Sequence, residues 1–307
     1  FCLAKIGRFE EVLEDYNRAI RINDNFAEAY NNRGRLWIKL NNRERAIEDF
    51  SKAIEQKKDY ANAYGNRAIC WAAIDQKYQA IEDWSQVLQI KSVDPLAFNN
   101  RGVLYHEIGK KLKALADFTS AIRFKPAYVD AYINRGITHY SLKNYEQAMR
   151  DFNQSIELAV ENRALVYRGM TYFKMGLLEE AEADLERVLQ LDLRNKRALC
   201  YLGVIEVEKG NHKSALSFFK SSLEEDESFA EAYYHMGRLK MKQGYFKAAI
   251  HDLTNAIEHE ETSLDFYESR AKAYLEIGET SKACADWKRM NESDNRRVRT
   301  ELKLYCE

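Results

Sequence analysis

Tyr30-Asn31-Asn32-Arg33-Gly34 is the first full copy of a short stretch that returns along this chain every 34 residues. The next three copies are Tyr64-Gly65-Asn66-Arg67-Ala68, Phe98-Asn99-Asn100-Arg101-Gly102 and Tyr132-Ile133-Asn134-Arg135-Gly136. Four later copies keep the step of 34 after one step of 33, and they contain Arg168-Gly169, Leu202-Gly203, Met236-Gly237 and Arg270-Ala271. A fixed period of this length predicts a repeat architecture, in which each repeat packs on its neighbours.

Two further positions recur in the same register. An alanine follows the arginine position by thirteen residues in every copy, at Ala46, Ala80, Ala114, Ala148, Ala181, Ala215, Ala249 and Ala283. A bulky residue stands four positions later, at Phe50, Trp84, Phe118, Phe152, Leu185, Phe219, Leu253 and Trp287. The small residue at the glycine position lets two helices approach closely, and the bulky residue fills the space between them. The pattern therefore predicts paired helices.

With this period and this order of aromatic residues, glycine and alanine, the chain resembles the tetratricopeptide repeat family over nearly its whole length. The resemblance implies an all-α fold, a right-handed α-solenoid (superhelix) of helix-turn-helix repeats. We expect one domain over residues 1–307. The chain begins inside a repeat, so we expect it to be a slice of something longer, with the turn of that first, partial repeat at Gly7. Its expected parts are a partial repeat at 1–26, repeats at 27–60, 61–94, 95–128, 129–161, 162–195, 196–229, 230–263 and 264–293, and a capping helix at 294–307.

The charge balance excludes two classes of partner. The chain has 47 basic and 48 acidic residues, a formal net charge of −1, which removes the bulk electrostatic attraction to nucleic acid or anionic membranes. The chain contains no apolar run long enough to cross a bilayer. The expected partner is therefore a protein or peptide, with no nucleic acid and no membrane, and the oligomeric state stays open.

The residues needed for catalysis or metal binding do not come together in the sequence. The five cysteines, at positions 2, 70, 200, 284 and 306, show no metal or redox spacing, so we expect reduced thiols and, on that ground alone, a cytoplasmic location. The six histidines fall at unrelated places in the repeat, and there is no phosphate-binding glycine loop or nucleophile elbow. The sequence predicts no catalytic residue, no metal site and no cofactor.

Arginine and aspartate recur together, sixteen residues apart. The predicted pairs are Arg33 with Asp49, Arg67 with Asp83, Arg101 with Asp117, Arg135 with Asp151, Arg168 with Asp184, and Arg270 with Asp286. Where Leu202 replaces the arginine, Phe218 replaces the aspartate, which is the joint loss expected for a structural ion pair between the two helices of a repeat. Met236 with Asp252 breaks the rule, so we expect Asp252 to be partly exposed.

Helix geometry assigns the concave face to the residues one before, two after and six after the arginine position. The first of these positions holds Asn32, Asn66, Asn100 and Asn134, then Tyr167, Tyr201 and His235. An amide side chain has the donors and acceptor needed to grip peptide backbone. The row is similar to the asparagine ladder in the repeats of O-linked N-acetylglucosamine transferase, and the alternative is that duplication copied a tolerated exposed asparagine.

The second of these positions predicts an apolar centre of the groove. It holds Ile69, Val103, Ile137, Met170 and Val204, followed by Arg238. Tyr140, Phe173, Arg163 and Arg197 lie beside this stripe, and aromatic and arginine side chains together are typical of interface hot spots. The alternative is lateral packing between neighbouring first helices. The dicarboxylate clamp of chaperone-binding family members is disfavoured, because it needs an asparagine where Arg35 and apolar residues stand.

These observations favour a non-catalytic scaffold for protein–protein interaction that binds an extended peptide segment in its concave groove. One alternative is a structural component of a large assembly, such as a ciliary or secretion complex, joined through convex faces or ends. Another is the substrate-recruiting region of a larger enzyme. The sequence alone does not choose between them.

Overall fold

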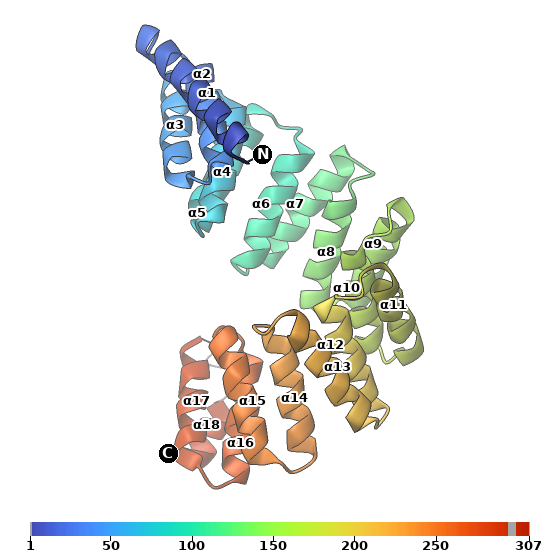
Figure 1. Ribbon diagram of the computed structural model, residues 1–307. Helices are drawn as coiled ribbons and strands as arrows, with labels where there is room; N and C mark the ends of the chain where they lie inside the picture. The colour runs from blue at the N-terminus through green and yellow to red at the C-terminus, as the bar shows by residue number, and fades with distance from the viewer. Residues whose placement is uncertain (1, 294–298, 307) are drawn as a thin grey trace. The chain divides into compact units, whose positions relative to one another are not determined.

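The computed structural model describes residues 2–293 and 299–306, and eighteen helices make up the regular structure of this part (Figure 1). Sixteen of them form eight helix-turn-helix pairs. The first helices are α2 (Ala27–Lys39), α4 (Ala61–Ala73), α6 (Pro95–Glu107), α8 (Val129–Ser141), α10 (Asn162–Lys174), α12 (Lys196–Glu208), α14 (Ala230–Lys242) and α16 (Leu264–Glu276). The second helices are α3 (Arg43–Gln56), α5 (Lys77–Ile90), α7 (Lys111–Phe124), α9 (Tyr145–Leu158), α11 (Leu178–Leu191), α13 (His212–Glu225), α15 (Phe246–His259) and α17 (Thr280–Ser293). The expected all-α repeat architecture is confirmed.

The two remaining helices are α1 (Cys2–Ile22) and α18 (Arg299–Tyr305). The expected turn at Gly7 is wrong, because α1 runs through that residue without a break. A continuous helix satisfies the backbone hydrogen bonds of this segment without a turn. The expected capping helix at 294–307 corresponds to α18 from Arg299 onward, whereas residues 294–298 lie outside the described part.

The turn inside each repeat needs one residue with a positive φ angle. Five repeats place a glycine there, with φ between 76° and 82°, at Gly109, Gly176, Gly210, Gly244 and Gly278. Asn41, Asp75 and Lys143 take the same position with φ of 58°, 60° and 62°. Asparagine and aspartate tolerate this conformation, but for lysine it is unusual. The repeat geometry therefore imposes the turn even where the preferred residue is missing.

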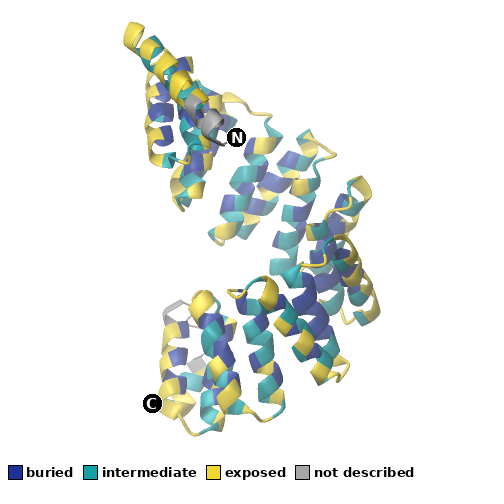
Figure 2. Ribbon diagram, viewed as in Figure 1, coloured by how far each residue is buried: buried dark blue, intermediate teal, exposed yellow. Residues whose placement is uncertain are grey.

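Close helix packing explains the second glycine row. A Cβ atom added at Gly102 would lie 2.7 Å from the ring of Phe118, which is fully buried between the two helices of its repeat. Gly34, Gly136 and Gly203 face Phe50, Phe152 and Phe219 in the same way, at 2.6 Å. Figure 2 shows buried residues along the sides of the helices and exposed residues at many of the turns. The predicted pairing of a small with a bulky residue thus forms the core of these repeats.

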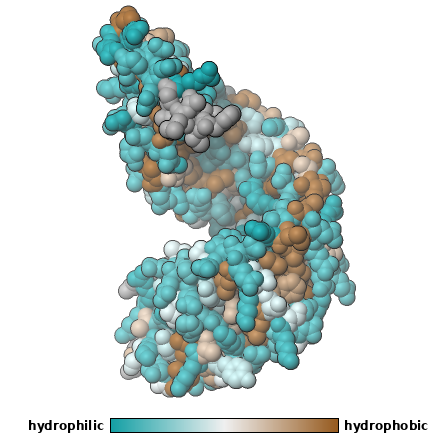
Figure 3. Space-filling model, in the orientation of Figure 1, coloured by the Kyte–Doolittle hydropathy of each residue, from teal (hydrophilic) through white to brown (hydrophobic). Residues whose placement is uncertain are grey.

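The chain divides into two compact units, residues 1–160 and 161–307, and the division falls within the one shortened step of the repeat. Within each unit a second helix packs between the first helix of its own repeat and that of the next, and most successive first helices also touch. First helices therefore form one face of a unit, here called the inner face, and second helices form the outer face. On the surface visible in Figure 3, hydrophilic residues predominate and hydrophobic residues gather in smaller groups. None of the described helices combines the length and apolar character needed to cross a membrane.

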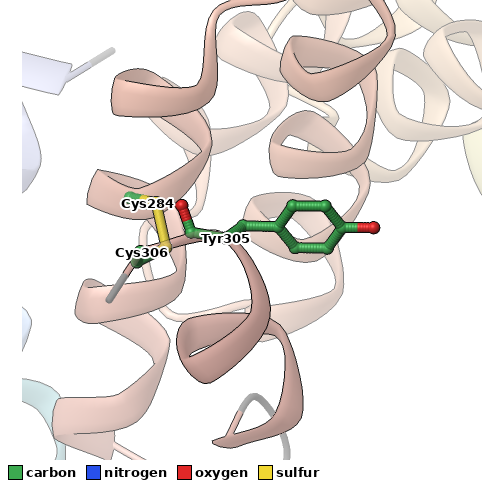
Figure 4. Close-up of a disulfide and its surroundings, with 3 residues drawn as sticks. All are labelled: Cys284, Tyr305 and Cys306. Atoms are coloured by element: carbon green, nitrogen blue, oxygen red, sulfur yellow. Dashed lines mark hydrogen bonds between the residues drawn. A yellow bond between two sulfur atoms is a disulfide. The ribbon is translucent and has the colours of Figure 1, made fainter.

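A disulfide joins Cys284 of α17 to Cys306, which follows α18 (Figure 4). The expectation of reduced thiols is wrong for these two cysteines, because packing of α18 on α17 brings their Cα atoms within 5.7 Å, a normal disulfide distance. The rings of Trp287 and Tyr305 stack beside it, with centroids 5.7 Å apart. Cys70 and Cys200 are free and buried. The cytoplasmic expectation rested on reduced thiols and loses that support.

Candidate functional site

Each predicted arginine–aspartate pair connects the two helices of one repeat. Nε and Nη2 of Arg101 donate hydrogen bonds to the two carboxylate oxygens of Asp117, both at 2.8 Å. The other five pairs have the same two-pronged geometry, at Arg33–Asp49, Arg67–Asp83, Arg135–Asp151, Arg168–Asp184 and Arg270–Asp286. All six aspartates are buried. The structure thus places these twelve residues between helices and not on a binding face.

The arginines also reach back to the preceding helix pair, a contact that the sequence analysis missed. Nη1 of Arg101 donates to the hydroxyl of Ser85 on α5 at 3.0 Å, so one guanidinium joins three helices. The same bond joins Arg33 to Asn17, Arg67 to Ser51, Arg135 to Thr119 and Arg270 to Thr254. A signal for it existed, since a serine, threonine or asparagine stands sixteen residues before each of these arginines.

The two repeats that lack the arginine have different interactions at this position. Leu202 is buried and Phe218 is half-buried, so in that repeat two apolar side chains take the places of the ion pair. In the next repeat Asp252 is only 4% exposed, and Nζ of Lys240 lies 2.6 Å from its Oδ2 atom. The expectation that Asp252 is partly exposed is therefore wrong. Lys240 stands one turn after Met236 on the same helix face, so its long side chain supplies the missing cation.

Two members of the asparagine row bond to other asparagines within the fold. Nδ2 of Asn66 donates to Oδ1 of Asn31, and Nδ2 of Asn134 donates to Oδ1 of Asn99, both at 3.0 Å. The two acceptors are buried and belong to the preceding first helix. These bonds join successive repeats in the first unit. They give the asparagines a structural role beside any role in holding a peptide.

Asn100 differs from its neighbours in the row. The equivalent acceptor position on the preceding helix is Gly65, which has no side chain, and Asn100 has no side-chain hydrogen bond in the described part of the chain. The glycine accommodates Trp84, whose ring lies 3.3 Å from the place that a Cβ at Gly65 would take. The larger core residue of this repeat thus leaves no acceptor for Asn100, which lacks the bond that Asn66 and Asn134 make. Asn32 accepts a long contact of 3.5 Å from Asn31.

A cavity of about 340 Å³ opens on the inner face of the second unit, between α10, α12 and α14, which lie side by side in Figure 1. We call it the inner-face cavity. Its apolar surface comes from Phe173, Val204, Val207, Phe219 and Leu239. Phe173 and Val207 are half-buried at its walls, whereas the other three are buried beneath. A hollow of this size is at the small end of ligand sites and suits a single large side chain.

Several members of the predicted apolar stripe are not exposed. Met170 and Val204 are 4% and 7% exposed, so the expectation that they form an open apolar stripe is wrong, and Tyr201 of the neighbouring first position is only 8% exposed. The first helices α10 and α12 contact each other, and so do α12 and α14, so large side chains on their facing sides cover one another. Lateral packing therefore explains these three residues. Phe173 keeps enough exposure to meet a ligand.

The two arginines beside the stripe have different environments. Arg163 is exposed, whereas Arg197 is half-buried and its Nη1 atom donates to the hydroxyl of Tyr167 at 2.9 Å. Nε of Arg197 also lies 3.4 Å from a carboxylate oxygen of Glu231. Arg197 is therefore held between α10 and α14 by residues of its own unit. The sequence pattern placed Arg197 at an interface hot spot, but the structure already matches its charge with Glu231 within the same unit.

Cations surround the mouth of the inner-face cavity. Lys174, Arg238 and Lys242 line it and are exposed, against one carboxylate, that of Glu208. His235 lines it too, and burial, followed by the charges of Arg238 and Lys174, lowers its pKa to about 3, so the imidazole is neutral at pH 7. Lys174, Glu208 and Lys242 all stand six residues after the arginine position, the third inner row of the helix geometry.

The first unit has a smaller hollow of about 280 Å³ on its inner face, above Trp84. Ile69 is 49% exposed at its edge, and Arg35 and Lys91 line it as well. Val103, Ile137 and Tyr140 are half-buried further along α6 and α8, and the ring of Tyr140 lies 5.8 Å from that of Tyr145. Among the described residues, no group of acidic residues, histidines and cysteines is arranged to hold a metal ion.

Sequence models described as tetratricopeptide repeat match residues 27–60, 129–162, 168–228 and 230–261. Together they cover more than half of the chain, which belongs to the tetratricopeptide repeat family. Repeat proteins of this kind typically bind other proteins on extended surfaces. A search of curated proteins found no match.

Solved structures show the same fold at low sequence identity. The crystal structure of the APC/C hetero-tetramer Cut9–Hcn1 is 15% identical with a TM-score of 0.66, over 96% of this chain and 58% of that one. A tetratricopeptide repeat protein from Parabacteroides merdae is 23% identical with a TM-score of 0.66, over 80% and 99%. PilF from Pseudomonas aeruginosa is 19% identical with a TM-score of 0.59, over 69% and 97%. This chain thus spans little more than half of the Cut9–Hcn1 chain, and the likeness is one of fold.

Proposed function

We propose that this chain is a non-catalytic scaffold that binds an extended segment of a partner protein along the inner face of its first helices. The inner-face cavity carries the proposal, because it is a hollow with an apolar floor and a charged mouth, built by three successive first helices. The hollow above Trp84 offers a separate contact point within the first unit. An extended segment is the ligand whose side chains reach into small, separate hollows of this kind.

A second candidate is a component of a large assembly that joins through the outer face. Two exposed apolar side chains on second helices favour it, Tyr78 on α5 and Leu112 on α7, at 66% and 78% exposure. Single exposed apolar residues are common on soluble proteins, so this observation is weaker than a formed hollow.

One experiment compares the two faces. Peptides from an unbiased display library would be selected on the chain, and their binding measured for variants of each face. Ile69→Glu and Phe173→Ala change the inner face, and Leu112→Glu changes the outer face at a more exposed position. Circular dichroism would check that all three variants keep their helices. Loss of binding with the inner variants alone supports the scaffold, whereas loss with Leu112→Glu alone overturns it in favour of the second candidate.

A further inference from the structure

The mouth and the floor of the inner-face cavity have different chemistry. The floor is apolar, with the buried rings and chains of Phe219, Val204 and Leu239, so it favours an apolar group that leaves water. Phe173 stands at the wall and is half-buried, so its ring is placed to contact such a group. The cavity has room for one large side chain and not for a folded domain. The ligand group that enters it is therefore aromatic or a large aliphatic.

The charges at the mouth select what lies beside that group. Three cations, Lys174, Arg238 and Lys242, face one anion, Glu208, in a chain whose total charge is close to zero. The residues that line this cavity therefore carry an excess of positive charge, whereas the neighbouring hollow that Arg238 also lines contains the carboxylates of Asp265 and Glu268. This positive charge attracts carboxylates and repels basic segments. Its effect is strongest next to the apolar floor, where less water screens the charges. Glu208 disfavours a ligand that is acidic at every position.

We infer that the inner-face cavity binds a peptide segment in which an aromatic or large aliphatic residue is flanked by aspartates or glutamates. The apolar side chain enters the hollow beside Phe173, and the flanking carboxylates pair with Arg238 and Lys242 at the mouth. The inference rests on the proposed function and assigns the class of segment that this part of the inner face takes. Aromatic anchors with a charged rim are the arrangement in which a few contacts carry most of the affinity.

Three short labelled peptides of equal length test the inference, one with phenylalanine between acidic residues, one with alanine between the same acidic residues, and one with phenylalanine between lysines. Fluorescence anisotropy should show the first binding at least about tenfold more tightly than either of the others. Its affinity should fall as salt concentration rises, because the flanking charges pair at an exposed mouth.

Matched charge reversals locate the site. The double variant Arg238→Glu with Lys242→Glu should weaken the first peptide at least about tenfold and remove most of its salt dependence. The control, Lys213→Glu with Lys220→Glu, makes the same change of charge at exposed positions of α13 and should leave binding unchanged. Phe173→Ala should mainly speed dissociation.

Two results would overturn the inference. One is equal or tighter binding of the lysine-flanked peptide, and the other is equal weakening by the control on α13. A failure of the proposed function looks different, because then the unbiased library yields no segment whose binding depends on the inner face. Selection of inner-face binders with basic or featureless sequences would keep the scaffold and reject this ligand class.

Discussion

The arginine–aspartate pairs make a quantitative prediction about stability. Arg101→Met removes the guanidinium that donates to both oxygens of Asp117 at 2.8 Å and leaves a carboxylate whose side chain is 8% exposed without its cation. Breaking a buried pair on one side costs about 3–5 kcal/mol. Since the Arg101 side chain is still 19% exposed, we expect the lower end, about 3 kcal/mol. The matched change Arg187→Met, at an exposed position of α11, should stay within about 0.5 kcal/mol.

The paired change should be much milder than its parts. Arg101→Leu with Asp117→Phe copies the apolar solution of Leu202 and Phe218, so no charge is left buried alone. We expect the double variant to recover at least about 1 kcal/mol relative to the sum of its single changes. Urea unfolding followed by circular dichroism measures all three, with the slope of each transition checked for a change of mechanism. Additive losses, or an Arg101→Met variant as stable as the parent, would refute the pairing argument.

Three further predictions concern the asparagine bonds, His235 and the disulfide. Asn134→Ala should lower the free energy of unfolding in urea by about 1–2 kcal/mol, because buried Asn99 loses a hydrogen bond. Asn100→Ala should change it by no more than about 0.5 kcal/mol, and equal losses in the two variants would contradict this explanation. The pKa of His235 is lowered from 6.5 to about 3, so as pH falls the unfolded state takes up the proton before the folded state does. The free energy of unfolding should therefore fall as pH drops from about 6.5 toward 3, by up to about 1.4 kcal/mol per pH unit. His235→Phe should flatten that loss, and an unchanged profile in thermal melts would exclude His235 as its source. Reduction of the Cys284–Cys306 disulfide should lower the free energy of unfolding of α17 and α18 by about 3 kcal/mol, which would appear as faster hydrogen exchange in those helices. Exchange rates that do not change with reductant would show that the disulfide does not stabilise these helices.

The helices could be predicted from the sequence because they depend on contacts inside one repeat. The spacing of Gly102 and Phe118 reports a close approach of two adjacent helices, and the same spacing recurs in other repeats. The first helix of each repeat begins at the residue where the predicted repeat begins, for the same reason. The disulfide could not be predicted this way, since Cys306 meets Cys284 through the packing of a helix outside the repeat pattern.

The candidate site could be predicted only in part, because exposure on the inner face depends on the neighbouring repeat. Helix geometry places Met170 and Val204 toward that face, but the next first helix covers them. Arg197 was chosen for its position in the row, whereas its charge is matched by Glu231 on α14, thirty-four residues further along. The open mouth is reached by Lys174 and Lys242 at the sixth position after the arginine and by Arg238 at the second.

The asparagine row shows how one exception separates two explanations. Asparagine inside a helix is less favourable than alanine by roughly half a kcal/mol, so each copy needs a compensating contact. Asn66 and Asn134 have one in their bonds to buried asparagines of the preceding repeat, which accounts for them without a ligand. Asn100 lacks that bond because Gly65 has no side chain to accept it and the ring of Trp84 occupies the space. The structural explanation therefore does not extend to Asn100. If the row grips peptide backbone, Asn100→Ala should weaken peptide binding to the first unit while leaving stability unchanged. If duplication alone retained it, the same variant should bind as the parent does.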